Sequence, residues 1–410
     1  MATVLAYTSP AIGHLFPTVP LLLELRDRGH DVHVRTLGDH VGMLRDLGLA
    51  AEPIDPRVGR VLPSDFRAGN ARAALRSAVQ TFTERAALDG PDLDRALTEV
   101  APDAVVVDIN AWGALLAAEA WGRPWATFSP YTPPIRSAGT PPFGPGLLPS
   151  PGLLGRARDA VVRPLVIGTT EKAMTPRINT LRAERGLGPI STADEFFRRA
   201  PVMLVATAEP FEYAHPDWGE RVRMIGAMSW EPPAERPGWL DELEGDVVLV
   251  TTSSEYQADE ALVRSALEGL ADEPYTVVAT MPARASARTA VPANAHVVDF
   301  VPHGPVLERA AVAVTHGGMG STQKALARGV PVCVVPFGRD QLEVAARVVT
   351  SDSGTRLPAA RLTPERLRAK VREAATKTAG ARRVAHGYAA AGGPAAGATA
   401  VEELLRPARV

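Results

Sequence analysis

The sequence lacks the features that mark several large classes of protein. Its 410 residues include one cysteine, Cys333, so no disulfide can form within the chain, and the surrounding apolar run indicates a small buried side chain rather than a nucleophile. The formal net charge is -2, without the basic excess that nucleic-acid binding needs. No apolar run reaches the roughly 18 residues of a membrane helix, and no signal-peptide pattern opens the chain. We therefore expect a cytoplasmic protein with no nucleic-acid partner and no membrane span.

The residues that are present describe an ordinary globular protein with more than one domain. Apolar residues make up 46% of the chain and charged residues 22%. At roughly 100–200 residues per domain, two domains fit the length best. Short β-branched runs alternate with stretches of helical composition in both halves, which is the pattern of parallel sheets covered by helices. The expected strands are 4–7, 31–36, 104–107, 125–128, 202–206, 246–251, 275–279, 295–298, 312–314 and 332–335.

A change in composition separates the two halves. Residues 229–238 hold three prolines, which exclude a helix and a central strand and so indicate a linker. Residues 131–165 are rich in proline and glycine with scattered apolar side chains, which fits a loop that covers a substrate and equally a mobile surface excursion. The predicted limits are a first domain at 1–228, a linker at 229–244, a second domain at 245–390 and a final helical segment at 391–410.

The most informative stretch runs from Thr315 to Gln341. It joins a strand end, a glycine-rich helix start with Gly318 and Gly320, a second strand, and an acid–amide pair formed by Asp340 and Gln341. The unpaired N–H groups at a helix start can hold a diphosphate. Carboxylate and amide side chains at the same edge of the sheet suit sugar hydroxyls. The stretch therefore predicts a nucleotide-sugar site.

This stretch resembles the donor-binding signature of nucleotide-sugar-dependent glycosyltransferases of the two-domain type B fold, in particular the macrolide and antibiotic glycosyltransferases related to UDP-glycosyltransferases. Residues 13–17 match the family's Gly-His-x-x-Pro and residues 299–303 its Trp-x-Pro-Gln region, so the likeness covers nearly the whole chain. The resemblance implies two doubly wound, Rossmann-like α/β domains whose parallel sheets face a central cleft. The acceptor is expected on residues 1–228 and the donor on 245–390, with the final helix packed back on the first domain.

Two residues of the first domain are the predicted catalytic pair. His14 follows the first expected strand and Asp108 follows the strand 104–107, so both lie at the carboxyl edge of an open parallel sheet. A histidine held by a carboxylate is a suitable general base for a hydroxyl, since its unperturbed pKa is about 6.5. The resemblance gives the histidine this role, with the aspartate as its partner. The alternative is structural: His14 packs beside the helix start and Asp108 is an N-cap or loop residue.

In the second domain, His316 and the N–H groups from Gly318 to Thr322 are expected to receive the diphosphate, with the Ser321 and Thr322 hydroxyls as further donors. Phe300 stands where many relatives carry a tryptophan near the base. A plain core position is the alternative for that residue. The predicted donor-binding residues are Ser253, Ser254, Phe300, Val301, His316, Gly318, Gly320, Ser321, Thr322, Asp340 and Gln341.

Two of these assignments carry a qualification of their own. The main chain of Val301 is expected at the pyrimidine edge. Ser253 and Ser254 follow the strand 246–251 and are expected near phosphate or sugar, but Ser253 replaces the glycine usual in relatives, which leaves a backbone contact there open.

No metal site and no cofactor beyond the nucleotide-sugar co-substrate is expected. Asp92 and Asp94 imitate a metal-binding Asp-x-Asp, but they follow Gly-Pro and are interpreted as first-turn residues of a helix. His30 and His33 lack acidic or cysteine partners at ligand spacing. The loop at 8–13 is not Gly-x-Gly-x-x-Gly, which argues against a dinucleotide-dependent dehydrogenase.

The resemblance implies an inverting hexosyltransferase that moves a sugar onto a hydroxyl of an apolar natural product. The acceptor is expected near four aromatic residues for which a core position is the alternative: Trp112, Phe128, Tyr131 and Phe143. A nucleotide-sugar epimerase of similar fold and a catalytically silent activator of a partner enzyme are the rival functions. A homodimer and a helper protein both stay open.

The nucleotide is expected to be dTDP, carrying a deoxyhexose. Eight residues after His316, many UDP-using relatives have a glutamate that holds the ribose hydroxyls, whereas this chain has Lys324. An ammonium cannot accept those hydrogen bonds, so a donor without the 2′-hydroxyl would lose least. The alternative is that Lys324 and Arg328 form a solvated basic face of the helix.

Overall fold

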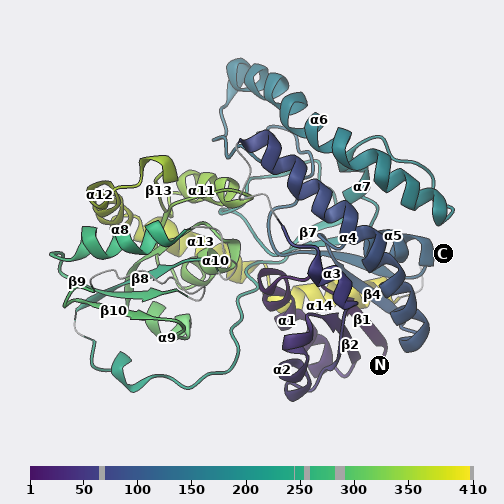
Figure 1. Ribbon diagram of the computed structural model, residues 1–410, viewed down its shortest axis with the longest axis horizontal. Coiled ribbons are helices and arrows are strands. Elements are labelled where there is room, and N and C mark those ends of the chain that lie inside the picture. Colours follow the sequence, from purple (N-terminus) through teal and green to yellow (C-terminus); the bar gives the residue numbers. More distant parts are fainter. Residues whose placement is uncertain (64–69, 244, 254–258, 282–290, 407–410) are drawn as a thin grey trace.

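The computed structural model describes residues 1–63, 70–243, 245–253, 259–281 and 291–406. In this part of the chain two parallel β-sheets form the centres of two lobes that lie side by side, each with its own helices (Figure 1). The predicted fold class, two doubly wound α/β domains, is confirmed.

The first sheet has seven parallel strands in the order β3-β2-β1-β4-β5-β6-β7. They are β1 (Thr3–Tyr7), β2 (Asp31–Thr36), β3 (Ala50–Pro53), β4 (Ala104–Asp108), β5 (Trp125–Ser129), β6 (Val202–Val205) and β7 (Val222–Met224). β1 pairs with β2 on one side and β4 on the other. The strand order reverses at this point, so the carboxyl ends of β1 and β4 form the edge where such sheets bind ligands.

The second sheet has six parallel strands in the order β10-β9-β8-β11-β12-β13. They are β8 (Asp246–Thr251), β9 (Tyr275–Thr280), β10 (Ala295–Val298), β11 (Ala310–Thr315), β12 (Val332–Val334) and β13 (Gly354–Arg356). The order reverses between β8 and β11, which pair directly. The second ligand-binding edge therefore lies at the carboxyl ends of these two strands.

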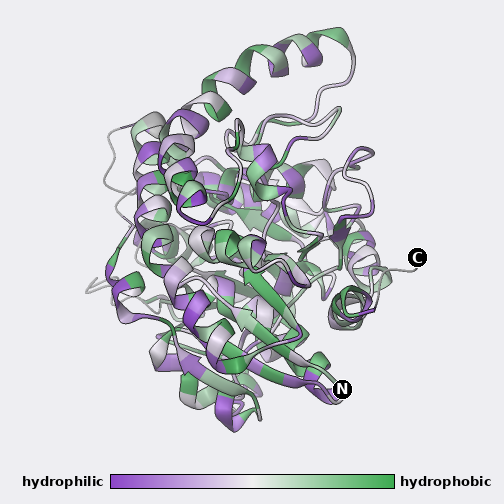
Figure 2. Ribbon diagram, turned by 90° about the vertical axis from the view of Figure 1, so that its right-hand side faces the viewer, coloured by the Kyte–Doolittle hydropathy of each residue, from purple (hydrophilic) through white to green (hydrophobic). Residues whose placement is uncertain are grey.

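Each sheet is buried on both faces, which explains why its strands read as continuous apolar runs. Along β1, Leu5 and Tyr7 belong to one apolar core while Val4 and Ala6 belong to the other. The side chains of β8 alternate in the same way between two further apolar cores. Figure 2 shows the green, apolar strands of the first sheet enclosed by helices that carry the hydrophilic residues.

The helices connect successive strands. In the first half they are α1 (Ile12–Asp27), α2 (Val41–Asp46), α3 (Pro56–Arg60), α4 (Ala71–Val100), α5 (Trp112–Trp121), α6 (Gly152–Glu184) and α7 (Ala193–Phe197). In the second half they are α8 (Glu260–Leu270), α9 (His303–Leu307), α10 (Met319–Leu326), α11 (Gln341–Thr350), α12 (Pro364–Ala375), α13 (Thr378–Ala390) and α14 (Gly393–Leu404). The 3-10 turns are η1 (Gly38–His40), η3 (Gly238–Leu240) and η4 (Ala359–Arg361).

Three long helices contain proline in their interior, and two of them, α4 and α6, differ from the sequence-based expectation. α1 begins at Ile12 and continues through Pro17 and Pro20, so His14 lies in its first turn. α6 begins at Gly152, inside the stretch expected to be irregular up to residue 165, and projects from the body of the molecule (Figures 1 and 2). α4 runs through Pro91, so Asp92 is a buried mid-helix residue that accepts from the Tyr7 hydroxyl, and the first-turn interpretation was wrong. A proline removes one hydrogen bond from a helix, and packing of the long helices compensates for it.

The last described helix, α14, returns to the first lobe (Figure 1). Ala398 and Val401 lie in the core between α1 and the first sheet, and Arg28 of α1 forms an ion pair with Glu402 at 2.9 Å. This packing ties the end of the described chain to its beginning. Among the described residues, no helix has both the length and the apolar character needed to cross a bilayer.

Candidate functional site

The predicted catalytic pair lies at the carboxyl edge of the first sheet. His14 is placed by the first turn of α1 and Asp108 by the end of β4, and His14 Nδ1 lies 2.8 Å from Asp108 Oδ2. The Asp108 side chain is 1% exposed and the His14 side chain 15% exposed. The other carboxylate oxygen accepts the backbone N–H of Asn110 at 2.8 Å. A carboxylate held on both oxygens fixes the imidazole, while one side of the ring stays open to solvent.

Two side chains that the sequence did not identify as part of this pair contact it. Asn110 Nδ2 lies 3.1 Å from His14 Nε2, and the Tyr131 hydroxyl donates to Asn110 Oδ1 at 2.8 Å. The Tyr131 ring also meets the imidazole edge-on, with centroids 5.8 Å apart. The position of Asn110, two residues after the predicted Asp108, was the available signal. Tyr131 was expected only as part of an acceptor surface.

The four aromatic residues expected near the acceptor divide into two groups. Trp112 and Phe128 are buried core residues, 4% and 1% exposed, so the core alternative holds for both. Tyr131 and Phe143 are not fully buried and lie together, with ring centroids 6.5 Å apart. Tyr131 stands beside His14 and Phe143 beside Tyr131, so this second pair remains the candidate acceptor surface.

The second lobe brings Asp340 to the same place. Asp340 precedes α11, and its charge acts on both His14 and Tyr131 of the first lobe. Burial raises the pKa of Asp340, and the nearby His14 opposes that rise. The predicted sugar-binding carboxylate and the predicted base therefore affect each other electrostatically, although they belong to different lobes.

Gln341 has a more local task than the sequence suggested. It is 2% exposed, and its Oε1 accepts the backbone N–H groups of Phe337 and Gly338 at 2.7 and 3.1 Å. These bonds hold the loop that presents Asp340. The neighbouring Arg339 has a left-handed backbone with φ of 56°, and its charge acts on His316 and Asp340. Arg339 is a site residue that the sequence analysis missed.

The glycine-rich turn after β11 is built around His316. Gly317 has φ of 93°, which favours glycine. A Cβ on Gly318 would stand 2.4 Å from His316 Nε2, whereas a Cβ on Gly320 would meet nothing within 4 Å. Gly318 therefore makes room for the imidazole over the start of α10, and Gly320 borders open space. The Ser321 hydroxyl caps this turn by donating to the Gly318 carbonyl at 3.1 Å.

Thr322 does not fit its predicted role. It is fully buried, its hydroxyl lies 3.4 Å from that of Thr315, and its backbone N–H donates to the Gly318 carbonyl. The helical turn points this side chain at the sheet instead of the open edge. The first N–H groups of α10, from Met319 to Ser321, are those that a helix leaves without an intrahelical acceptor.

His316 itself is 8% exposed. Burial lowers its pKa to about 4, with a smaller opposing effect from the Thr251 backbone, so the ring is neutral at physiological pH. Its Nδ1 has no hydrogen-bond partner among the residues that the structure describes. A neutral imidazole at a helix start can donate one hydrogen bond to an anion without adding charge.

The remaining predicted donor residues differ in exposure. Phe300 is 61% exposed, so the core alternative is wrong for this residue, while Val301 is 1% exposed and packs in the core of the second lobe. Ser253 is 4% exposed, and its backbone N–H donates to Asp259 at 2.7 Å. Ser254 lies outside the described residues.

Lys324 is held by the linker instead of by solvent. Its Nζ lies 2.9 Å from Oε1 of Glu231, whose two oxygens also accept the backbone N–H groups of His303 and Gly304 at 3.0 Å. Burial favours the neutral form of Glu231, but the Lys324 charge and hydrogen bond outweigh it and lower the pKa of that carboxyl. The solvated-face alternative therefore fails. A carboxylate does lie beside the helix position where relatives carry glutamate, but it comes from the linker.

A buried ionic network joins the two lobes next to the site. Oε1 of Glu343 on α11 accepts the backbone N–H groups of Gly144 and Gly146 from the irregular loop of the first lobe, each at 2.8 Å. Arg347 binds Glu343 at 2.9 Å and Glu212 of the first lobe at 2.7 Å. Burial favours the neutral form of Glu212, but Arg347 and His215 outweigh it and lower the pKa of Glu212 to about 2. The loop after β5 is thus fastened to the helix that follows Asp340.

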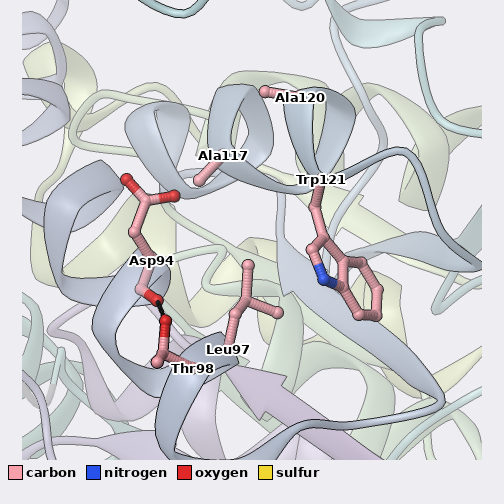
Figure 3. Close-up of a pocket in the computed structure, with 6 residues that line it drawn as sticks. All are labelled: Asp94, Leu97, Thr98, Ala117, Ala120 and Trp121. Carbon is pink, nitrogen blue, oxygen red and sulfur yellow. Dashed lines mark hydrogen bonds between the residues drawn. The ribbon is translucent and has the colours of Figure 1, made fainter.

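A cavity of about 320 Å³ lies elsewhere, between α4 and α5 (Figure 3). Its lining residues are Asp94, Leu97, Thr98, Ala117, Ala120 and Trp121. Asp94 is already paired with Arg185 at 2.8 Å, and no second titratable group lines the space. The convergence of His14, Asp108 and Asp340 makes the interlobe edge, and not this cavity, the candidate functional site.

Comparisons with known proteins agree with this fold. A family model described as Erythromycin biosynthesis protein CIII-like, C-terminal domain, matches residues 264–404. The 4'-demethylrebeccamycin synthase of Lentzea aerocolonigenes is 32% identical over 387 residues, which cover 90% of this chain and 91% of that protein. The demethyllactenocin mycarosyltransferase of Streptomyces fradiae is 28% identical over 100% of this chain and 87% of its own length.

Solved structures share the whole architecture. The glycotransferase of kitacinnamycin superimposes with a TM-score of 0.76 at 26% identity and covers 99% of both chains. The glycosyltransferase VinC in complex with DTDP superimposes with a TM-score of 0.71 at 21% identity, over 98% of this chain and 99% of that one. The resemblance inferred from the sequence motifs is confirmed. The chain belongs to the macrolide and antibiotic glycosyltransferase family of the two-domain type B fold, and it is a natural-product glycosyltransferase.

Proposed function

We propose that this glycosyltransferase moves a deoxyhexose from a dTDP-sugar onto a hydroxyl of an apolar natural product, with inversion at the anomeric carbon. His14 Nε2 takes the hydroxyl proton, and the acceptor oxygen forms a bond to the anomeric carbon from the face opposite the nucleotide. The bond between that carbon and the diphosphate oxygen breaks, and the diphosphate leaves with the electron pair. The observation that carries this proposal is the His14–Asp108 pair at 2.8 Å, with Asp340 of the other lobe beside it.

Asp108 supports the role of His14 as a base. A carboxylate only accepts hydrogen bonds, so the contact with Asp108 places the ring proton on Nδ1 and the lone pair on Nε2. The same carboxylate stabilises the imidazolium that forms when the proton is taken. General-base catalysis of this kind contributes roughly 10²–10⁴ in rate.

The donor half of the proposal rests on the turn after β11. The N–H groups at the start of α10 and the neutral His316 suit a diphosphate that gains charge as it leaves. The electrostatic effect of His14 on Asp340 suits a role for Asp340 in binding a sugar hydroxyl at the reacting end. The exposed ring of Phe300, at the end of β10, suits stacking on a nucleobase.

The choice of dTDP over UDP rests on Lys324. Its ammonium accepts no hydrogen bond, and Oε1 of Glu231 is engaged by this ammonium and by the His303 N–H, so residue 324 itself offers a ribose 2′-hydroxyl no acceptor of the kind that a glutamate there would provide. Two structural neighbours were crystallised with this nucleotide, VinC with DTDP and the Streptomyces sp. SF2575 enzyme SsfS6 with thymidine diphosphate. Those ligands are properties of those proteins, and they agree with the preference proposed for this chain.

Calorimetric dissociation constants of dTDP and UDP test the nucleotide preference. We expect wild type to prefer dTDP and Lys324→Gln to shift the ratio toward UDP by one or two hydrogen bonds, roughly 0.5–1.5 kcal/mol each. Glutamine accepts hydrogen bonds without placing a second carboxylate beside Glu231, as Lys324→Glu would. A wild-type preference for UDP, or an unchanged ratio in the variant, would show that Lys324 does not set a preference for dTDP.

A panel of dTDP- and UDP-sugars against apolar hydroxylated acceptors, read by product mass, tests the reaction itself. The proposal predicts a glycoside of increased mass, with free nucleoside diphosphate released only when an acceptor is added. An epimerase would convert the donor without an acceptor, and a silent activator would turn over no donor. Either result would contradict the proposed transfer.

A further inference from the structure

The hydrogen bonds around His14 form a chain of four side chains, from Asp108 to Tyr131. Asp108 Oδ2 lies 2.8 Å from His14 Nδ1, Asn110 Nδ2 lies 3.1 Å from His14 Nε2, and the Tyr131 hydroxyl lies 2.8 Å from Asn110 Oδ1. Each contact has one consistent direction. The carboxylate accepts from Nδ1–H, Nε2 accepts from the amide N–H, and the amide oxygen accepts from the phenol.

These hydrogen bonds therefore favour the neutral form of the His14 ring that carries its lone pair on Nε2. A protonated Nε2 would carry a hydrogen directed at the amide N–H₂ group, which has no lone pair to accept it. The Tyr131 hydroxyl holds the amide in this orientation, and burial raises the pKa of Tyr131 so that it remains a donor. Asn110 thus occupies the one position on His14 that a general base must offer its substrate.

The surrounding backbone and packing keep these groups in place. The Asn110 N–H donates to Asp108 Oδ1 at 2.8 Å, and the Ala111 N–H donates to the Asp108 carbonyl at 3.0 Å, so the turn after β4 is closed on itself. The Tyr131 ring packs against the apolar cores of both lobes. Tyr131, the last of the four hydrogen-bonded side chains, therefore lies where the two lobes meet.

We propose that Asn110, oriented by Tyr131, is a positioning residue that holds Nε2 of His14 as a hydrogen-bond acceptor and yields this position to the acceptor hydroxyl. The proposal rests on the general-base role of His14 given above. Asn110 touches neither the sugar nor the bond that breaks, and its effect passes through the imidazole. Among the residues that the structure describes, charged and titratable groups that act on His14 or its hydrogen-bond partners include Asp108 from β4, Tyr131 from the loop after β5 and Asp340 before α11.

Asn110→Asp gives the sharpest test, because it replaces the amide donor with a carboxylate. His14 would then lie between two carboxylates, which stabilise the imidazolium, and an added charge at this distance shifts a titration by about 1–3 pH units. We expect the His14 midpoint, followed by NMR of imidazole-labelled protein and assigned with His14→Ala, to rise by about one unit or more. Asn110→Ala removes the donor without adding charge and should raise the midpoint by a smaller amount, and Tyr131→Phe by less again.

Asn179→Ala is the matched control. Asn179 is likewise half-buried and makes two side-chain hydrogen bonds with the backbone of Ile190, at 2.9 and 2.8 Å, outside the site. It should lower the unfolding midpoint without moving the His14 titration. If Asn110→Asp does not fold, Asn110→Ala and Tyr131→Phe decide the question by the same titration.

The same effect should appear in the pH profile of kcat/KM. In Asn110→Asp the acidic limb should move to higher pH, while the dTDP dissociation constant stays unchanged. An unmoved His14 titration in folded Asn110 variants overturns the proposal. The NMR titration needs no turnover, so it separates this inference from the proposed function. If His14→Ala keeps wild-type turnover, His14 is not the general base. The proposed replacement of Asn110 by the acceptor hydroxyl at His14 Nε2 then fails as well.

Discussion

Two histidines occupy corresponding edges of the two sheets, yet their surroundings give them opposite properties. His14 lies beside the end of β4, partly exposed and bound to the Asp108 carboxylate at 2.8 Å. His316 directly follows β11, is 8% exposed, and has its pKa lowered to about 4 by burial. A carboxylate partner prepares one ring to take a proton, and burial keeps the other neutral. We therefore propose that a histidine at the carboxyl edge of one sheet serves proton transfer and a histidine at the carboxyl edge of the other serves anion binding.

The largest expected effect comes from removing the first histidine. His14→Ala should lower turnover on an aliphatic hydroxyl by about a hundredfold or more, the range of general-base catalysis, and leave the dTDP dissociation constant nearly unchanged. Steady-state kinetics and calorimetry measure the two quantities. Wild-type turnover in the folded variant, or an equal loss of nucleotide binding, would show that the lobes do not divide the work in this way.

The second comparison changes two glycines of the turn around His316. Gly318→Ala places a Cβ 2.4 Å from His316 Nε2 and must displace the ring, so both stability and dTDP affinity should fall, the affinity by about tenfold or 1.4 kcal/mol. Gly320→Ala meets nothing within 4 Å and should keep or raise stability. Its methyl group enters the open space at the helix start, so dTDP should still bind more weakly. Unchanged dTDP affinity in both variants would move the diphosphate away from this turn.

A smaller effect separates Asp340 from Gln341. Asp340→Ala should weaken binding of the intact nucleotide sugar by a few-fold more than binding of bare dTDP, because one hydrogen bond contributes about 0.5–1.5 kcal/mol net. Gln341→Ala should weaken both ligands alike, because its amide holds the backbone of Phe337 and Gly338. Calorimetric titration with both ligands checks this. Equal weakening by Asp340→Ala would give that residue a structural role.

The buried histidine also predicts a pH dependence of stability. The unfolded chain takes up a proton at His316 near pH 6.5, and the folded protein does so only near pH 4. Between these values the unfolded state binds more protons, so stability is full above pH 6.5 and falls by about 2 kcal/mol by pH 5. Denaturant titrations of His316→Gln should lose that part of the decline, with the exposed His386→Gln as control. An unchanged decline in His316→Gln would mean that His316 is not buried in its neutral form.

Much of this arrangement was predictable from local sequence. The alternation of β-branched runs gave both parallel sheets, because strands buried on both faces must be apolar throughout. Four site residues were predicted because they follow strands, and the residues that follow parallel strands gather at the carboxyl edge of their sheet. They are His14 and Asp108 in the first lobe and His316 and Asp340 in the second. The edge strands β3, β7 and β13 were missed because they are short and interrupted by polar residues or proline, so they lack the continuous apolar run of the equally short β12.

The parts that escaped prediction depend on contacts between distant segments. Glu231 reaches Lys324 across 93 residues, and Glu212 reaches Arg347 across 135. No spacing rule connects such pairs. The role of Asn110 was hidden for a different reason, since an asparagine after a strand is an ordinary turn residue until Tyr131 and His14 are seen on either side of it. Proline misled the helix boundaries, because packing compensated for the hydrogen bonds that it removes.

The pH dependence of kcat/KM in three proteins tests the division between the histidines most directly. Wild type should show an acidic limb that keeps its position in His316→Gln, a variant that should bind donor more weakly. The limb should disappear from the residual activity of His14→Ala. A limb that persists in His14→Ala, or that moves in His316→Gln, would contradict the assignment of proton transfer to the first lobe alone.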